Sequence, residues 1–230
     1  KSRLEVVTPS ISVGIATKTE STQNLNTLLI EAEKEMYFNK QEDGIKFREN
    51  LLINLSKKMD KVHPELLSHT TNVALIIADF AKHMGYTKEE TSLLINLATY
   101  HDIGWVGVDS SVQLTSDPIT EEDKFKIRNH TEIGFRIMKA IPKFVHLADF
   151  IGNHHEHWDG SGYPNGIKGK SISIQNRILL IIDAYEVMTS DKKYSENKTK
   201  QQAFATLRKY AGLKYDPELV EKFIEMKEKE

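Results

Sequence analysis

The 230-residue sequence contains no cysteine. This absence excludes disulfide bonds, thiolate zinc sites and cysteine nucleophiles together, and it fits a reducing compartment. No stretch approaches the roughly 18–20 consecutive apolar residues of a membrane-spanning helix. The first ten residues also lack the apolar core of a signal peptide. We therefore expect a soluble, cytoplasmic protein with no membrane span.

An excess of charge of one sign is lacking as well. The 31 Lys and Arg nearly balance the 33 Asp and Glu, for a net charge of −2. Such a balance gives no sign of the excess positive charge that binding to polymeric nucleic acid or to an acidic membrane surface requires. The 39% hydrophobic and 28% charged content is that of an ordinary globular chain. The length suits one large domain or two small ones.

Histidine is concentrated in one short stretch. From His154 to Asp159 the chain places three imidazoles and two carboxylates in six residues, and a Gly-Ser-Gly-Tyr-Pro turn follows. Glycine and proline end helices, so we expect a helix carrying the histidines to stop near Trp158. Adjacent side chains on a helix point about 100° apart. His154 and His155 could then address two ions, or one ion and one substrate. A polar loop with chance histidines is the alternative, and the positions of the other histidines decide between them.

The first 46 residues predict a small α/β segment. Residues 4–7 and 11–16 are rich in β-branched residues and predict strands, with Pro9 between them. Residues 25–39 carry apolar side chains at helical spacing, and Gly44 lies just beyond. A strand with unpaired edges tends to recruit another strand. We therefore expect this segment to dock on the rest of the chain or to pair with a second copy, forming a homodimer.

Three parts of this segment resemble the C-terminal end of a GGDEF (diguanylate cyclase) domain. They are Ser12-Val13-Gly14-Ile15-Ala16, Glu31 to Tyr37, and Asp43-Gly44. The Gly-Gly-Asp-Glu-Phe signature is absent, so the resemblance assigns no cyclase chemistry to this chain.

From Phe47 onward helical patterns dominate. Helices are predicted at 47–60, 64–84, 88–100, 120–139, 142–157, 172–190, 199–211 and 216–228. Pro64, Pro142 and Pro217 fall where the first turn of a helix tolerates proline. The expected fold class is mainly α, a helical bundle over residues 47–230 behind the small α/β segment of residues 1–46.

Other potential metal ligands are spread along this helical region. Glu65 and His69 are four residues apart on one predicted helix, so they share a face. His101 and Asp102 end another apolar helix, where their desolvation needs compensation. Asp183 lies inside the apolar run from Ile178 to Ala184, and a lone carboxylate in such surroundings is rarely left unpaired.

Together these motifs resemble the HD-GYP subgroup of the HD-domain metal-dependent phosphohydrolases. The resemblance is carried by His101-Asp102-Ile103-Gly104, His130-Thr131-Glu132-Ile133-Gly134, His154-His155-Glu156, Asp159-Gly160-Ser161-Gly162-Tyr163-Pro164 and Asp183 to Asp191. It implies an HD-domain helical bundle around two or three divalent metal ions, which hydrolyses cyclic di-GMP to linear pGpG and, as a further step, to GMP. The implied ligands are Glu65, His69, His101, Asp102, His130, His154, His155 and Asp183.

The resemblance also implies roles within the site. Asp102 is the bridging carboxylate and, with His101, the catalytic pair, while Gly162, Tyr163 and Pro164 shape the substrate pocket. Imidazole and carboxylate ligands without thiolate suit iron or manganese at least as well as zinc. In such a centre one ion activates water and another takes charge from the phosphoryl oxygens.

Two positions depart from the family pattern. The family has lysine after His-Asp-X-Gly, where this chain has Trp105, and only Lys192 remains of two later cations because Ser195 replaces the second. Trp105 could stack on a guanine or plug the pocket. If the missing lysine limits catalysis, Trp105→Lys is predicted to raise kcat/KM. Two alternatives stay open: a non-catalytic cyclic-dinucleotide receptor, and a phosphodiesterase for another cyclic dinucleotide or phosphoester.

Overall fold

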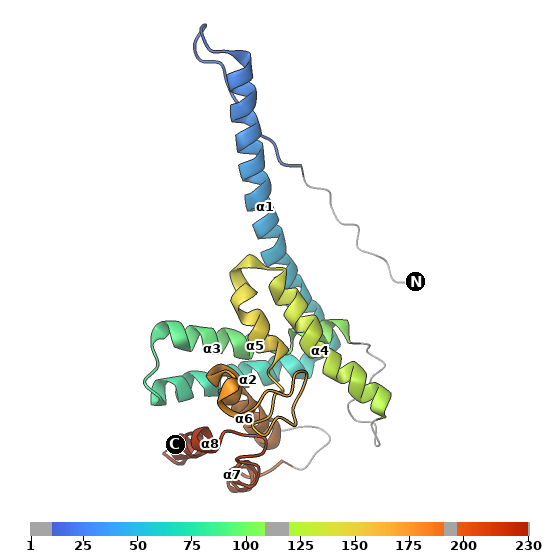
Figure 1. Ribbon diagram of the computed structural model, residues 1–230, viewed down its shortest axis with the longest axis vertical. Coiled ribbons are helices and arrows are strands. Elements are labelled where there is room, and N and C mark those ends of the chain that lie inside the picture. Colours follow the sequence, from blue (N-terminus) through green and yellow to red (C-terminus); the bar gives the residue numbers. More distant parts are fainter. Residues whose placement is uncertain (1–10, 109–119, 191–196, 230) are drawn as a thin grey trace. The chain divides into compact units, whose positions relative to one another are not determined.

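The computed structural model describes residues 11–108, 120–190 and 197–229, and helices dominate these ranges (Figure 1). No β-strand occurs within them; a single isolated bridge joins Ala211 and Tyr215. The mainly α prediction is therefore confirmed. The elements in chain order are α1 (Leu25–Val62), α2 (Pro64–His83), α3 (Lys88–Tyr100), η1 (Ile103–Gly107), α4 (Glu121–Lys139), η2 (Pro142–Leu147), α5 (Ala148–Gly152), η3 (Gly169–Ser171), α6 (Ile174–Thr189), α7 (Lys200–Lys209) and α8 (Pro217–Glu228).

The chain divides into two compact units after Leu52. In the first unit the predicted strand at residues 11–16 is wrong, because this segment forms no secondary-structure element and pairs with no strand of the described chain. Side chains of α1 bind its backbone instead: the Ile15 N–H donates to Glu35 Oε2 at 2.6 Å, and Asn39 Nδ2 donates to the Val13 carbonyl at 2.9 Å. The strand predicted at residues 4–7 lies outside the described residues.

The helix predicted at residues 25–39 does not stop before Gly44 but continues to Val62 as one 38-residue helix. A glycine inside a helix costs only about 1 kcal/mol relative to alanine, and no proline interrupts the chain between Pro9 and Pro64. These corrections remove the strand from the GGDEF-like resemblance, which the structure does not support. The predicted homodimer stays a prediction.

The second unit is a bundle around α2 and α6. Helix α2 packs against α3 and α6, and α6 packs against α7 and α8. In Figure 1 the chain ends in α8, beside α6 and α7. Aromatic rings fill the space between them, with Phe80 of α2 and Tyr185 of α6 both in edge contact with Phe223 of α8. This core fixes the two helices that carry His69 and Asp183.

Most helix starts follow the sequence signals. Pro64, Pro142 and Pro217 each stand in the first turn of a helix, as predicted. Thr120 caps α4 by accepting from the Asp123 N–H at 3.1 Å, and the first turn is acidic. None of the described helices is both long and apolar enough to cross a membrane.

The helix predicted at residues 142–157 is broken, which changes the local structure of the central histidines. It consists of the short elements η2 and α5, and α5 ends at Gly152. Asn153 ends α5, because its side-chain amide donates to the Asp149 carbonyl at 2.8 Å while its own carbonyl accepts from Glu156 in a turn at 3.1 Å. His154 and His155 therefore lie in a turn and not on a helix.

Candidate metal centre

Three buried histidines share one local arrangement. In His101, His130 and His154 the Nδ1 atom lies 2.6–2.7 Å from the backbone carbonyl three residues earlier, that of Ala98, Ile127 and Ile151 respectively. A carbonyl oxygen only accepts hydrogen bonds, so each Nδ1 must carry the proton. The neutral ring then has its lone pair on Nε2, which is the state required of a metal-ligating imidazole.

These nitrogens converge with others into two groups of three potential ligands. One group is His69, His101 and Asp183, and the other is His130, His154 and His155; within each group the ligand atoms lie within 4.8 Å of one another. In the second group His130 Nε2 and His154 Nε2 are 3.2 Å apart. Two lone pairs at that distance repel each other unless a cation lies between them. Each group therefore fits one ion.

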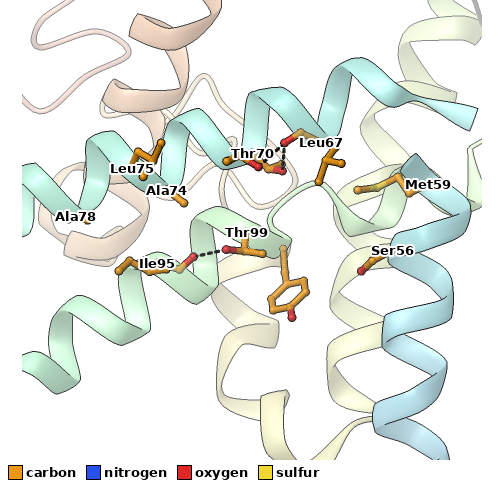
Figure 2. A pocket seen from close by; sticks show the side chains of 11 residues that line it. Ser56, Met59, Leu67, Thr70, Ala74, Leu75, Ala78, Ile95 and Thr99 are labelled. Atoms are coloured by element: carbon orange, nitrogen blue, oxygen red, sulfur yellow. Dashed lines mark hydrogen bonds between the residues drawn. The ribbon is translucent and has the colours of Figure 1, made fainter. Parts of the chain in front are cut away.

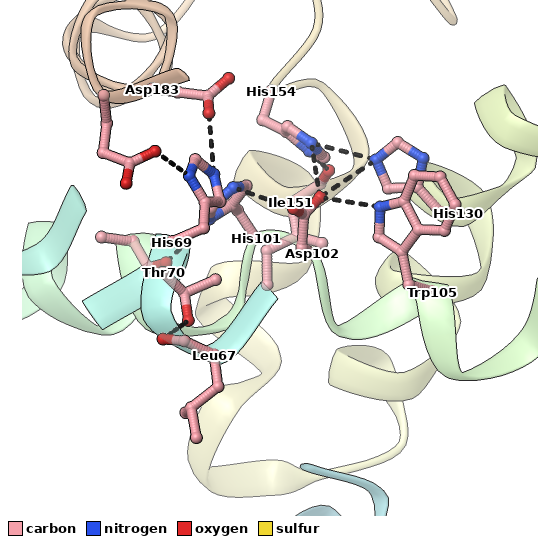
Figure 3. A network of polar contacts seen from close by, with 12 residues as sticks. Leu67, His69, Thr70, His101, Asp102, Trp105, His130, Ile151, His154 and Asp183 are labelled. Carbon is pink, nitrogen blue, oxygen red and sulfur yellow. Dashed lines mark hydrogen bonds and ion pairs between the residues drawn. The ribbon is translucent and has the colours of Figure 1, made fainter. Parts of the chain in front are cut away.

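Asp102 lies between the two groups (Figure 3). Its Oδ2 is 3.4 Å from His101 Nε2, whereas its Oδ1 is 3.5 Å from His130 Nε2 and 3.9 Å from His154 Nε2. One carboxylate oxygen thus faces each group, which is the geometry required of a carboxylate that bridges two ions. Burial would raise the pKa of Asp102, but the neighbouring imidazoles of His101 and His130 outweigh burial and lower it. Asp102 is therefore an anion throughout the neutral range.

His69 is held from both ring nitrogens. Its Nε2 lies 3.0 Å from Asp183 Oδ1, and its Nδ1 lies 2.5 Å from Glu186 Oε2. Burial alone would lower the pKa of His69, but the hydrogen bonds to Asp183 and Glu186 raise it to about 10. Burial likewise opposes ionisation of Asp183, and the bond to His69 lowers its pKa to about 2. At His69 Nε2 a proton and a divalent ion are alternatives, since either can lie between this nitrogen and the Asp183 carboxylate.

The other group has the opposite electrostatics. Burial and the neighbouring histidines lower the pKa of His155 to about 4, and that of His154 falls well below its ordinary value for the same reasons. Both rings are therefore neutral at physiological pH and free to donate lone pairs.

Glu186 is a functional candidate that the sequence reasoning did not single out. It is 3% exposed, and it lies one helical turn after Asp183 on α6. Its second oxygen accepts from Asn72 Nδ2 at 3.1 Å. A carboxylate on the far nitrogen of a metal-ligating histidine orients the ring and raises its basicity. The sequence signal was available, because Glu186 is a second carboxylate three residues after Asp183 in the same apolar helix, where a buried charge needs a partner.

Glu186→Gln should weaken metal binding by about 10- to 100-fold, because the charge that orients His69 is lost. Competition with a chelator of known affinity measures this change. Glu225→Gln, which alters an exposed glutamate paired with Lys229 on α8, is the matched control and should leave the affinity unchanged. Equal affinity in both variants would remove Glu186 from the centre.

Glu65 is not brought to either group. Its side chain is 63% exposed and lies 3.4 Å from His63 Nδ1. The predicted ligand role of Glu65 thus receives no support from its placement. The remaining seven predicted ligands lie together in the centre.

Trp105 is placed where it supports the centre. Its ring is 7% exposed and stacks on His130, with centroids 5.3 Å apart and planes 18° apart. Its Nε1 donates to Asp102 Oδ1 at 3.2 Å. A ring in this position is not open to a guanine, so the structure favours packing over the predicted substrate contact.

The loop predicted to shape the substrate pocket lies against the second group. The Tyr163 ring is 4.9 Å from the ring of His155, and the Tyr163 N–H donates to the His155 carbonyl at 3.2 Å. At Gly162 a Cβ would come within 2.5 Å of both the His157 nitrogen and the His155 oxygen, so only glycine fits. The Tyr163-Pro164 peptide is cis. Lys192, the other predicted substrate residue, lies outside the described residues.

Glu156 binds the backbone of this loop. Its carboxylate is 2% exposed and accepts three backbone N–H groups, from Asn165 at 2.6 Å, Gly166 at 3.1 Å and Ile167 at 2.9 Å. A buried carboxylate with three N–H donors needs no metal to satisfy it. Glu156 is thus a structural residue within the histidine motif.

A separate cavity of about 300 Å³ lies among the end of α1, α2 and α3 (Figure 2). Its lining includes Met59, Leu67, Ala74, Ile95 and Thr99. None of the candidate ligands lines it, so it is distinct from the metal centre.

Comparison with known proteins agrees with this class of site. A helical bundle that encloses two clusters of histidine and aspartate is a candidate metal-binding domain. A model of the HD domain matches residues 52–219. The chain belongs to the HD-domain family. No residue of the GGDEF-like segment falls within the matched range.

Among curated relatives, the chain is 33% identical over 200 residues to a cyclic di-GMP phosphodiesterase of Thermotoga maritima, covering 86% of this chain and 54% of the relative. It is 28% identical to 3'3'-cGAMP-specific phosphodiesterase 2 of Vibrio cholerae, covering 76% of this chain and 34% of that protein. The chain thus spans about half or less of the length of these relatives.

Solved structures share the fold. A protein of Bdellovibrio bacteriovorus described as HDG"Y"P superposes with a TM-score of 0.59 at 18% identity, covering 92% of this chain and 75% of that one. The HD domain of the phosphodiesterase PgpH of L. monocytogenes, in complex with cyclic-di-AMP, superposes with a TM-score of 0.55 at 17% identity, covering 75% of this chain and 92% of that one. At such identities the likeness shows the HD-domain fold alone.

Proposed function

We propose that this protein is a metal-dependent phosphodiesterase that hydrolyses cyclic di-GMP to linear pGpG. The observation that carries the proposal is Asp102, whose two carboxylate oxygens face two separate groups of ligand atoms. Two ions held on a shared carboxylate are the arrangement that suits in-line displacement at a phosphodiester. The curated relative named a cyclic di-GMP phosphodiesterase supports the choice of substrate.

The donor set fits two divalent ions, for which we propose iron or manganese. Each group supplies imidazole nitrogens, Asp102 and Asp183 add carboxylate oxygens, and the sequence has no thiolate that would favour zinc. When bound, such ions acidify water and withdraw charge from phosphoryl oxygens. The protein needs no side-chain nucleophile for this chemistry.

The chain's own residues prepare this site before substrate arrives. The backbone carbonyls of Ala98, Ile127 and Ile151 fix three imidazoles in the tautomer that presents Nε2. Glu186 orients His69, and Trp105 holds the shared carboxylate. Such preorganisation means that little reorganisation is needed during the reaction.

The test is reconstitution of the metal-free protein with Fe(II) or Mn(II) without oxygen, followed by elemental analysis and a turnover assay. We expect two ions per chain and conversion of cyclic di-GMP to pGpG, with GMP as a slower second product. One ion or none after reconstitution would contradict the two-ion centre. Two ions with tight cyclic di-GMP binding but no turnover would instead establish a receptor.

A second substrate is favoured by a specific observation, since another relative is named for 3'3'-cGAMP. The assay therefore includes 3'3'-cGAMP and cyclic di-AMP beside cyclic di-GMP. A kcat/KM at least tenfold higher for either of these would keep the phosphodiesterase and change its substrate.

A further inference from the structure

Arg128 lies near the candidate metal centre and contacts the loop that carries Tyr163. It is an exposed residue of α4, two residues before His130. Its guanidinium carbon lies 5.1 Å from the centroid of the Tyr163 ring. Tyr163 in turn packs on His155, one of the three histidines of the second group. Tyr163 thus contacts both a candidate ligand, His155, and Arg128.

The Tyr163 ring is a rigid platform for this arginine. Contact with His155 fixes one side of the loop, Gly162 allows its close backbone approach, and Glu156 binds the backbone beyond Pro164. A guanidinium that stacks on an aromatic face keeps its N–H donors at the edge of its plane. None of the described carboxylates forms an ion pair with Arg128, whereas Arg136 on the same helix is paired with Glu132 at 2.7 Å. The edge of the Arg128 guanidinium therefore remains available to a ligand.

The chemistry of that ligand follows from the donors and from the substrate. A planar fork of N–H donors matches the oxygens of a phosphate. A cyclic dinucleotide has two phosphates, and a two-ion centre holds the one being cleaved. A cation placed away from the ions would stabilise the other phosphate. Trp105 cannot provide it, because an indole carries no charge and this one is buried against His130.

We propose that Arg128 binds the second, uncleaved phosphate of a cyclic dinucleotide, with Tyr163 orienting the guanidinium. The proposal rests on the proposed function, since it assumes a substrate with two phosphates. It assigns a substrate-binding role to a residue outside the histidine and Gly-Tyr-Pro motifs. Arg128 would supply a positive charge, which the uncharged Trp105 does not.

The test compares Arg128→Gln, Arg128→Lys and the control Arg136→Gln, which changes the same residue type two turns along α4. Each metal-loaded variant is assayed on cyclic di-GMP, on cyclic di-AMP and on bis(p-nitrophenyl) phosphate, a diester with a single phosphate. Arg128→Gln should raise KM for both cyclic dinucleotides by about 10- to 100-fold, because one charge-assisted contact is lost. Its kcat on them and its rate on the small diester should stay within about twofold of wild type.

The other variants sharpen the result. Arg128→Lys should give an intermediate KM, because lysine keeps the charge but loses the planar fork. Arg136→Gln should match the wild-type enzyme. The proposal is overturned by an unchanged KM in Arg128→Gln, by an equal loss on the small diester, or by a loss confined to the guanine-containing substrate, which would indicate a base contact.

Failure of the proposed function is distinguishable from failure of this inference. If the wild-type enzyme cleaves the small diester but no cyclic dinucleotide, the proposed function fails. Calorimetric Kd values for cyclic di-GMP on metal-loaded wild-type protein and on Arg128→Gln then decide the role of Arg128. A 10- to 100-fold weaker Kd in the variant supports phosphate binding, and equal Kd values overturn it.

Discussion

Asp102→Asn should lower kcat/KM for cyclic di-GMP by more than the roughly 10- to 100-fold that loss of an outer-shell partner costs at metal sites. The substitution preserves the shape of the side chain and removes its charge. Asp102 is 8% exposed, and its carboxylate is flanked by His101 on one side and by His130 and His154 on the other. Because one residue serves both groups, its loss affects two ions at once. Bound metal should fall from two ions per chain to one or fewer.

Elemental analysis of the reconstituted variant and a cyclic di-GMP assay measure the two effects together. Asp79→Asn makes the same change at an exposed carboxylate on α2 and should leave both values at the wild-type level. If Asp102→Asn kept two ions and wild-type turnover, the bridging assignment would be wrong. Loss of a single ion with the rate unchanged would place the chemistry on one group alone.

The side chains that meet in the candidate centre could be singled out from the sequence because their residue types and spacing carry the information. His101-Asp102, His130, His154-His155 and Asp183 stand in motifs that survive any error in local structure. His154 and His155 illustrate this, since they were expected on a helix and lie in a turn, and still converge with His130. The chemistry of the centre depends on which side chains meet and not on the element that carries each of them.

The orientation of these candidate ligands could not be predicted in the same way. Each Nδ1–carbonyl contact of His101, His130 and His154 spans three residues, but it depends on the local backbone turning the carbonyl toward the ring. Glu65 shows the reverse case, because ideal helical spacing with His69 did not bring its carboxylate to the centre. Pro64 starts α2 immediately before Glu65, so this glutamate lies in the first turn and its side chain contacts His63.

The strand prediction in the N-terminal region was wrong for a different reason. Alternating β-branched residues from Ile11 to Ala16 favour an extended backbone, but the structure assigns no strand there. A strand also needs a partner, and the described chain offers side chains of α1 instead, through Glu35 and Asn39. Local pattern predicts backbone conformation, whereas pairing is a property of the whole fold.

Trp105→Lys should destabilise the protein and lower its activity, which reverses the expectation from sequence alone. From the sequence, Trp105 replaces a lysine that contacts phosphate in the family pattern, so Trp105→Lys was predicted to raise kcat/KM. The structure places the indole between His130 and Asp102, 7% exposed. Removing a buried tryptophan costs about 3–5 kcal/mol. For a domain of this size each kcal/mol lowers Tm by about 2–4 °C, so we expect a fall of about 6–20 °C.

Trp105→Phe separates the two contributions of the indole. Phenylalanine keeps a ring to stack on His130 but has no N–H for Asp102 Oδ1, so it should retain most of the Tm while metal affinity falls by about tenfold. Thermal unfolding of the metal-free proteins, chelator competition and kcat/KM for cyclic di-GMP measure the three quantities. A Trp105→Lys protein with wild-type Tm and a higher kcat/KM would mean that position 105 faces the substrate after all. A loss of Tm and metal affinity in Trp105→Lys, with loss of affinity alone in Trp105→Phe, would establish that the chain has exchanged a substrate contact for a support of its bridging carboxylate.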